Sequence, residues 1–304
     1  MPTFLLALIP ATLRSTTPLL LTALGGMFAE RSGVVNIALE GIMLFGALAA
    51  ALTTQQLEAP YLAVDANAQV FWIPWLGLLA GAIGGAMIAA VHAVVSIHYK
   101  ADQIVSGTAI NLLAFSVPSI LLQFFYNNTT NSQEILNRLP LWLGFSPLVY
   151  LAFGLVPFSW WLLFKTSWGL RLRAVGEHPQ AADTMGVNVA RVRYGAVLLS
   201  GVLAGLAGAY LSIGFLNQFV RGMSAGKGFI ALAAMIFGKW HPFGIFGATL
   251  LFGLADALAI QLQGGAILPA VLIQAFPFVL TMLVLAGLIN RARPPAALGK
   301  PYTS

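Results

Sequence analysis

The stretch that decides the fold runs from Phe71 to Ile97 and reads FWIPWLGLLAGAIGGAMIAAVHAVVSI. It contains no Asp, Glu, Lys or Arg, and its apolar residues are almost continuous. A helix needs about 20 apolar residues to cross the hydrocarbon core of a bilayer. A strand of a membrane barrel would instead alternate between apolar and polar residues, and this stretch does not. The stretch therefore predicts a membrane-spanning α-helix.

Comparable apolar stretches recur along the whole chain. The predicted spans are 11–29, 36–54, 71–97, 103–126, 147–165, 193–216, 244–263 and 269–289. A shorter apolar run, 228–238, lies between glycines and covers only about half of the hydrocarbon core. We interpret it as a broken or re-entrant half-helix, because irregular backbone at membrane depth occurs only where protein or a water-filled cavity covers it. The sequence thus predicts an all-α membrane protein, a polytopic helical bundle of about eight or nine membrane segments.

The composition agrees with a bilayer as the main solvent. Hydrophobic residues make up 59% of the chain and charged residues 8%, whereas a soluble domain carries about 25% charged residues. The absence of cysteine excludes disulfides, thiolate metal sites and cysteine nucleophiles, and no metal site is predicted. The net charge of +6 is scattered over short gaps between apolar runs, which favours a role in membrane topology over nucleic-acid binding.

The basic residues predict the orientation of the chain, because loops on the cytoplasmic side carry an excess of Lys and Arg. We placed the 165–193 loop in the cytoplasm and counted the short run as a crossing. Most of the 15 basic residues then lie inside, and those outside are Arg14, Arg138, Arg221 and Lys227. The N-terminus is then outside and the C-terminus inside. We expect one membrane domain, 1–290, followed by a proline-containing, flexible cytoplasmic tail, 291–304.

The 165–193 loop contains signals for a short helix. Pro179 suits the first turn of a helix and Gly186 suits its end, while Asn188 can cap the next membrane helix. One interpretation is a basic connection that only fixes topology. The other is a docking helix for a cytoplasmic partner, because small residues such as Ala181 and Ala182 allow close approach in a groove.

Three segments carry a resemblance to a known family. Leu172–Val189, LRAVGEHPQAADTMGVNV, resembles the coupling loop of ABC importer permeases, within the branch that includes ribose, branched-chain amino acid and nucleoside permeases. Gly33–Ala47, GVVNIALEGIMLFGA, is similar to an early segment of the nucleoside-type members. Gly226–Leu258, GKGFIALAAMIFGKWHPFGIFGATLLFGLADAL, is similar to their late segment. The likeness extends over roughly residues 20–290.

This resemblance implies a non-catalytic membrane subunit in the bacterial cytoplasmic membrane. Its expected partners are a second, usually different permease chain, cytoplasmic ATP-binding subunits that hold ATP and Mg, and an extracytoplasmic substrate-binding lipoprotein. The residues expected to couple to the ATP-binding subunits are Glu177, Pro179, Ala181, Ala182, Asp183, Met185 and Gly186. The chain itself has no phosphate-binding loop: Gly222–Lys227, GMSAGK, has the wrong glycine spacing.

Polar and aromatic residues inside the apolar runs are candidates for the translocation path. They are Asn36, Glu40, Asn111, Phe229 and Asp256. Asn36 and Glu40 stand at i and i+4 and would share a helix face. Because a charge at the bilayer centre costs about 3 kcal/mol, these residues either line the path or form hydrogen bonds between helices. Phe229 could stack on a nucleobase or simply pack in the bundle.

At the cytoplasmic boundary, Glu30 and Arg31 predict an edge ion pair or a helix-terminal contact.

The predicted function is the translocation of nucleosides by alternating access. A permease for a sugar or a branched-chain amino acid remains open, because a neutral polar path also suits a sugar. An ion-coupled secondary transporter is a different class, in which Glu40 or Asp256 would bind the coupling ion. A membrane-embedded enzyme is a third, but the sequence shows no recognisable nucleophile or metal constellation.

Overall fold

The structure is a computed structural model that describes residues 2–263, 275, 279 and 293–303. The predicted span 269–289 lies outside the described residues except at positions 275 and 279. The described elements are α1 (Pro2–Arg31), α2 (Leu39–Leu62), α3 (Ile73–Ala93), η1 (Val94–His98), α4 (Gln103–Tyr126), α5 (Pro147–Lys165), α6 (Ser167–Glu177), α7 (Pro179–Thr184), α8 (Val189–Ala209), η2 (Tyr210–Phe215), α9 (Lys227–Phe237) and α10 (Pro242–Gln263). The elements η1 and η2 are π-helical continuations of α3 and α8. The described part of the chain has the all-helical architecture that the sequence predicted.

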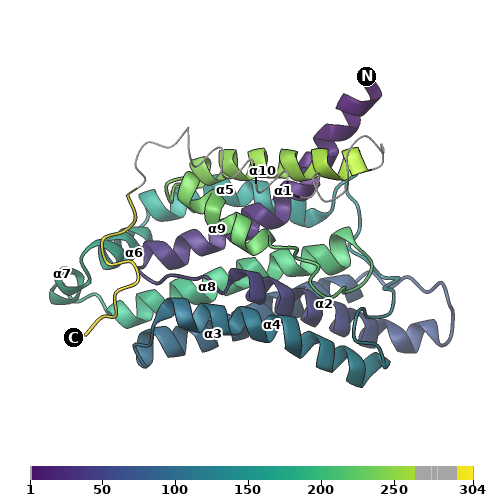
Figure 1. The fold of residues 1–304 in the computed structure, drawn as a ribbon, viewed down its shortest axis with the longest axis horizontal. Helices are drawn as coiled ribbons and strands as arrows, with labels where there is room; N and C mark the ends of the chain where they lie inside the picture. The colour runs from purple at the N-terminus through teal and green to yellow at the C-terminus, as the bar shows by residue number, and fades with distance from the viewer. Residues whose placement is uncertain (1, 264–274, 276–278, 280–292, 304) are drawn as a thin grey trace.

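The long helices lie side by side along one axis, so the connections gather at two ends (Figure 1). At one end, which we call the α7 end, α7 approaches the η1–α4 turn across a pocket lined by His98, Lys100 and Asp183. At the opposite end, Arg14 donates to the carbonyl of Gly144 at 2.9 Å. The loops predicted to be cytoplasmic therefore share one end of the bundle.

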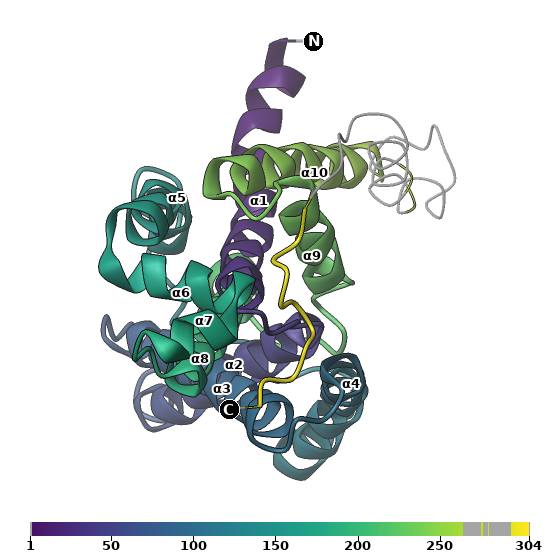
Figure 2. The ribbon, with the colours of Figure 1, turned by 90° about the vertical axis from the view of Figure 1, so that its left-hand side faces the viewer.

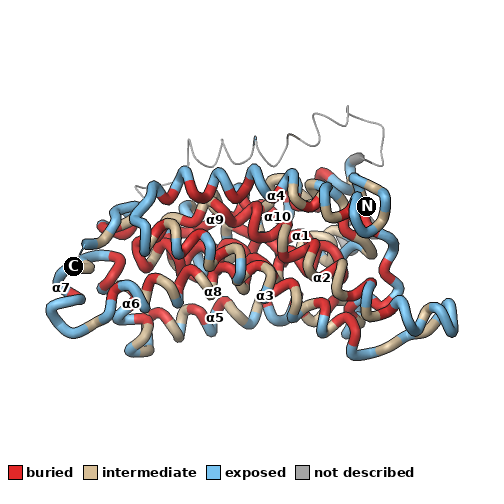
Figure 3. The backbone as a smooth tube through the Cα atoms, turned by 90° about the horizontal axis from the view of Figure 1, so that it is seen from below, coloured by how far each residue is buried: buried red, intermediate tan, exposed pale blue. Residues whose placement is uncertain are grey.

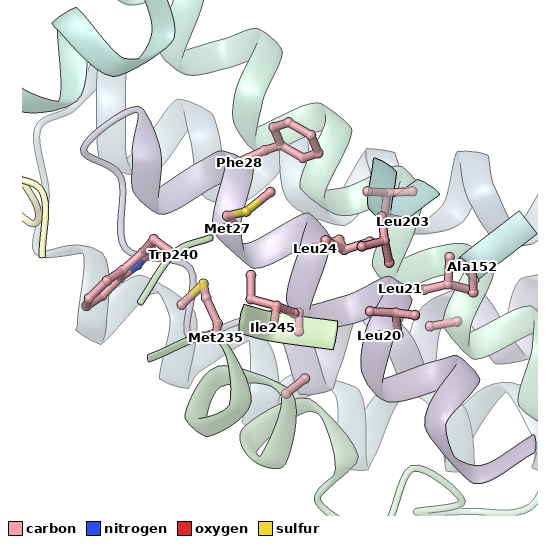
Figure 4. Close-up of a cluster of buried hydrophobic side chains, with 14 of the residues drawn as sticks. Leu20, Leu21, Leu24, Met27, Phe28, Ala152, Leu203, Met235, Trp240 and Ile245 are labelled. Atoms are coloured by element: carbon pink, nitrogen blue, oxygen red, sulfur yellow. The ribbon is translucent and has the colours of Figure 1, made fainter. Parts of the chain in front are cut away.

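Helix α1 is the centre of one half of the bundle, with α5, α9 and α10 around it (Figure 2). Every residue from 15 to 30 is buried. Figure 4 shows the core on this helix, where Leu20, Leu24 and Met27 point toward side chains of α5, α8 and α9. Burial by neighbouring helices explains why α1 tolerates serine, threonine and proline, which a lipid-facing helix of this length would carry less readily.

Helices α2, α3 and α8 approach one another at glycines. A Cβ atom at Gly205 of α8 would collide with the backbone of Gly81 and Gly85 in α3, and one at Gly46 of α2 would collide with Gly205. Water does not drive helices together inside a bilayer, so small residues that allow close backbone contact hold such helices together. This three-helix contact connects the two halves of the molecule, because α8 also packs along α1.

In the described part of the chain, five helices are long and apolar enough to cross a membrane. They are Ile73–His98, Gln103–Tyr126, Pro147–Lys165, Val189–Phe215 and Pro242–Leu262. The middle of the molecule is buried, and exposed residues concentrate at the ends and on the outward faces of the peripheral helices (Figure 3). Helices α1 and α2 are also long but contain more polar residues. The count of eight or nine segments remains a prediction.

Two segments cross part of the bundle without helical structure. Residues 32–38 lead from the α7 end to the start of α2, and residues 216–226 lead from the opposite end to the start of α9. Helix α9 has 11 residues, which gives it a length of about 16 Å. It occupies the place predicted for the half-helix 228–238.

The tail differs from the expected flexible segment. Its described part, 293–303, lies across the α7 end. The N–H of Ala297 donates to the carbonyl of Gly176 at 2.9 Å, and the N–H of Gly299 donates to the carbonyl of Gly33 at 3.1 Å. Arg193 of α8 donates to the carbonyl of Lys300 at 3.2 Å. Prolines prevent a helix here, but these hydrogen bonds hold a tail that turns at residues 296–299 against the bundle.

The glycine contact predicts a specific sensitivity in α8. Replacing Gly205 with Leu forces a side chain against the backbone of α3. We expect the free energy of unfolding to fall by about 1–3 kcal/mol or more. The matched control is Gly195→Leu on the same helix, where nothing lies within 4 Å of an added Cβ. Thermal unfolding in detergent should show a lowered midpoint for the first variant alone; equal midpoints would contradict the contact.

Candidate translocation path and coupling surface

Glu40 holds the start of the broken helix. Its side chain is 1% exposed and lies in the first turn of α2. One carboxylate oxygen accepts the N–H of Gly226 at 2.9 Å and the hydroxyl of Ser224, and the other accepts the N–H of Gly228 at 2.6 Å. A carboxylate at a helix N-terminus is favourable, because the first N–H groups have no partner within the helix. Glu40 therefore satisfies backbone donors where the chain leaves helical geometry.

The predicted pairing of Asn36 with Glu40 on one helix face is wrong. Asn36 precedes α2, which begins only at Leu39, so the i and i+4 relation does not apply. Its side-chain amide instead donates to the hydroxyl of Ser200 in α8 at 3.0 Å. Both side chains are buried. Asn36 thus attaches the irregular segment to the central helix.

The same irregular segment is attached to α3 and α4. The side-chain Oδ1 of Asn111 in α4 accepts the N–H of Gly41 at 2.8 Å, and its Nδ2 donates to the carbonyl of Ile37 at 3.0 Å. His92 of α3 lies 2.9 Å from the carbonyl oxygen of Val35. A single amide side chain therefore satisfies one donor and one acceptor at the non-helical entry to α2.

Asp256 forms an ion pair that the sequence analysis missed. Its carboxylate lies 3.2 Å from the ammonium nitrogen of Lys227, the first residue of α9. At 1.5 Å per residue, Asp256 is about 20 Å from the start of α10 at Pro242. Lys227 therefore lies deep in the bundle, and its predicted place outside the membrane is wrong. The error arose because the irregular segment, not α9, covers the outer half of this crossing.

Phe229 is 44% exposed on α9, so its ring remains accessible on the outer face of the half-helix.

Glu30 and Arg31 do not form the ion pair that we considered. Trp240 contacts both: its indole nitrogen donates to Glu30 at 2.6 Å, and its carbonyl accepts from the guanidinium of Arg31 at 2.9 and 3.0 Å. Both contacts lie at the end of α1, so they match the helix-terminal contact that the sequence offered as the alternative to an ion pair.

The 165–193 loop contains two helices, α6 and α7, where the sequence predicts one. Thr166 caps the additional helix, α6, by accepting the N–H of Gly169 at 3.1 Å. Helix α7 ends before Gly186, whose φ of 81° suits glycine. Asn188 caps α8 by accepting the N–H of Arg191 at 2.9 Å.

The side chains of α7 divide into a buried and an exposed set. Ala182 is buried with Val175 and Val189, so it holds α7 in place and does not offer a docking surface. The exposed residues are Glu177, Ala181, Asp183, Met185 and Gly186, while Pro179 is half-buried. Met185, at 83% exposed, is the most prominent apolar side chain of this surface. A hydrogen bond to the carboxyl of Asp183 raises the pKa of the Tyr302 hydroxyl in the tail.

The hydrogen bonds of Glu40 predict the effect of removing its charge. Glu40→Gln replaces one acceptor oxygen with a donor that faces an N–H or a hydroxyl, at a cost of about 1–3 kcal/mol. The segment 216–228 should then become more accessible to protease, while the remaining helices stay folded. Glu134→Gln, at an exposed position, is the matched control. Unchanged protease protection in Glu40→Gln would contradict this role.

The comparisons with known proteins agree in pointing to one family. The model of the family described as branched-chain amino acid transport system / permease component matches residues 8–285. Guanosine ABC transporter permease protein NupQ of Bacillus subtilis is 43% identical, covering 97% of this chain and 96% of the relative. Nucleoside ABC transporter permease protein NupC of Lactococcus lactis is 41% identical, covering 94% and 93%.

Two further relatives are more distant. The putative glucose ABC transporter permease protein TsgC13 of Haloferax volcanii is 34% identical over 98% of both chains. A second guanosine permease protein of Bacillus subtilis, NupP, is 26% identical over 84% of this chain and 74% of the relative. No solved structure matches the chain. The match to the family model and the near full-length relatives show that this chain belongs to the family of branched-chain amino acid transport system permease components.

Proposed function

We propose that this protein is the membrane-spanning permease subunit of an ATP-binding cassette importer for nucleosides. The observation that carries the proposal is the near full-length identity to NupQ and NupC, which are named for guanosine and nucleosides. The polar groups deep in the bundle support it, since amide, hydroxyl and paired charged groups suit a neutral, hydrogen-bonding solute. The chain itself is non-catalytic in this proposal, and ATP and Mg are held by partner subunits.

The α7 end faces the cytoplasm in this proposal. It contains the coupling loop, the basic η1–α4 turn and the described part of the tail. The exposed residues of α6 and α7 would dock on the ATP-binding subunits. Because Ala182 and the tail attach α7 to α6 and α8, a movement of α7 would be passed to the bundle and switch it between inward-open and outward-open states.

The translocation path runs along the broken segment in this proposal. Asn36 and Asn111 hold residues 32–38 in place, and Glu40 holds the start of α9. Phe229 and Asp256 remain accessible beside the broken helix. Broken helices are where transporters commonly place substrate sites, because non-helical backbone offers polar groups at membrane depth. The fixed residues would therefore shape the path, and the accessible ones would contact the solute.

The remaining partners follow from the importer architecture. A second permease chain would complete the path, and the two Bacillus subtilis guanosine permease proteins, NupQ and NupP, support a pair of different chains. An extracytoplasmic lipoprotein would deliver the substrate. The assembly would lie in the bacterial cytoplasmic membrane.

A sugar importer is the second candidate, favoured by the similarity to TsgC13. An ion-coupled transporter gains no support from the site, because Glu40 already accepts N–H groups and Asp256 already pairs with Lys227. The complex with its second permease and ATP-binding subunits, reconstituted in liposomes with the binding lipoprotein, separates these candidates.

In that system we expect ATP-dependent uptake of radiolabelled guanosine that unlabelled adenosine or uridine reduces and excess glucose or leucine does not. Competition by glucose in place of nucleosides would favour the sugar importer. Uptake by this chain alone, driven by an ion gradient without ATP, would contradict the proposal.

The exposed Met185 offers a test of the coupling surface that leaves the fold intact. Met185→Glu should abolish ATP-driven uptake, because it places a charge at the centre of an apolar contact, and should leave the unfolding midpoint unchanged. Val64→Glu is the matched control, since Val64 is 91% exposed in the loop after α2 at the opposite end. ATPase activity and uptake are measured together; normal uptake by Met185→Glu would contradict docking at this position.

A further inference from the structure

The ion pair between Lys227 and Asp256 lies close to the middle of the membrane. Lys227 begins α9, about 15 Å from the end of that helix at Phe237, and Asp256 is about 20 Å along α10 from Pro242. Both of these helix ends lie at the α7 end, where Trp240, between the two helices, binds Glu30 and Arg31. The hydrocarbon core is about 30 Å thick, so the pair lies near its midplane.

Neither member of the pair is buried. The side chain of Lys227 is 18% exposed and that of Asp256 is 24% exposed, in contrast to Glu40, which is 1% exposed. Charged groups at this depth are costly in lipid and almost always face the bundle interior or a water-filled cavity. The accessible side of the pair is therefore suited to face water or a polar solute.

The position of the pair is fixed from the protein side. Glu40 accepts the N–H groups of Gly226 and Gly228, the two neighbours of Lys227. The backbone of Lys227 is thus held while its side chain reaches across to α10. Asp256 stands on a helix that packs along α1, the central helix of this half of the bundle. A rigid support of this kind is what a specific contact with a solute requires.

The chemistry of the pair suits a vicinal diol. A carboxylate has about four lone-pair sites and an ammonium group has three N–H donors, and the contact between Lys227 and Asp256 uses one of each. The carboxylate can accept the two hydroxyl protons of a diol while the ammonium donates to a hydroxyl oxygen. Because the two charges cancel, the pair favours a neutral solute.

We propose that Lys227 and Asp256 form a binding site for the ribose hydroxyls of a nucleoside as it crosses the membrane, so that this permease discriminates ribonucleosides from deoxyribonucleosides. The inference rests on the proposed function and adds a selective step inside the permease. Asp256 accepts the 2′- and 3′-hydroxyl protons, and Lys227 holds the carboxylate in position.

The experiment measures selectivity in addition to rate. ATP-dependent uptake of radiolabelled guanosine and 2′-deoxyguanosine is compared in the reconstituted complex for the unmodified protein, for Asp256→Asn and for Asp65→Asn, a control in an exposed loop. The binding lipoprotein is the same in each case, so its own preference cancels. We expect the ratio of guanosine to deoxyguanosine uptake to fall about tenfold in Asp256→Asn, the size of one hydrogen bond to a charged group.

A double variant separates a solute contact from a structural ion pair. Lys227→Asp combined with Asp256→Lys restores the ion pair with its charges exchanged. We expect it to fold but not to recover the ratio of the unmodified protein, because the acceptor then stands on the wrong helix. Asp256→Glu keeps the charge and should shift the ratio by displacing the carboxylate; it replaces Asp256→Asn if that variant gives no folded protein.

An unchanged ratio in Asp256→Asn, or in Asp256→Glu where it serves in its place, would overturn the inference. Full recovery of uptake and ratio in the charge-exchanged variant would also overturn it, and would assign the pair to helix packing. If the unmodified complex takes up no nucleoside at all, the proposed function fails, and this inference fails with it.

Discussion

Peptide N–H groups that leave helical geometry within a membrane and are buried in protein have no water to bind, so the protein must supply their acceptors. In this protein the carboxylate of Glu40 supplies them at the start of α9. The rest of the site depends on that interaction, because it determines where the half-helix begins. The start of α9 sets the positions of Lys227 and Phe229, and at its position Lys227 pairs with Asp256.

The arrangement of the helices separates two kinds of polar residue. Those of the first kind, such as Asn36 and Asn111, are buried and bind backbone or other side chains, so they hold irregular segments in place. Those of the second kind, Lys227 and Asp256, remain accessible. Hydropathy alone does not separate the two kinds, because each appears in a sequence as one polar residue in an apolar run. Burial and hydrogen bonding together distinguish the residues that hold the backbone in place from the residues that remain accessible.

Local sequence signals predicted the local structure well. Pro179, Gly186 and Asn188 predicted a short helix, its end and the following cap, because capping depends on residues within one turn of each other. The half-helix was predicted to within a residue at each end, since glycines bound its apolar run. The main difference at this level is the helix α6, which Thr166 caps and where the sequence predicts a loop.

Contacts between distant segments could not be predicted from the sequence. The partners of Glu40 lie more than 180 residues away, and helical periodicity suggested Asn36 in their place because the break before Leu39 carries no strong signal. Lys227 was assigned to the outside because the short run was counted as a full crossing in a topology set by the excess of basic residues on the cytoplasmic side. The spacing of the residues identified candidates for the site, but only the packing of the helices showed which of them meet.

The tail has a consequence for how the protein is made. Residues 293–303 are synthesised after every helix described here, yet they provide an acceptor for Arg193 in α8 and bonds for Gly33 and Gly176. While a ribosome is still translating α10, the guanidinium of Arg193 has no carbonyl of Lys300 to bind. The surface around α7 therefore reaches its final form only late in biogenesis, after the rest of the described bundle has been synthesised.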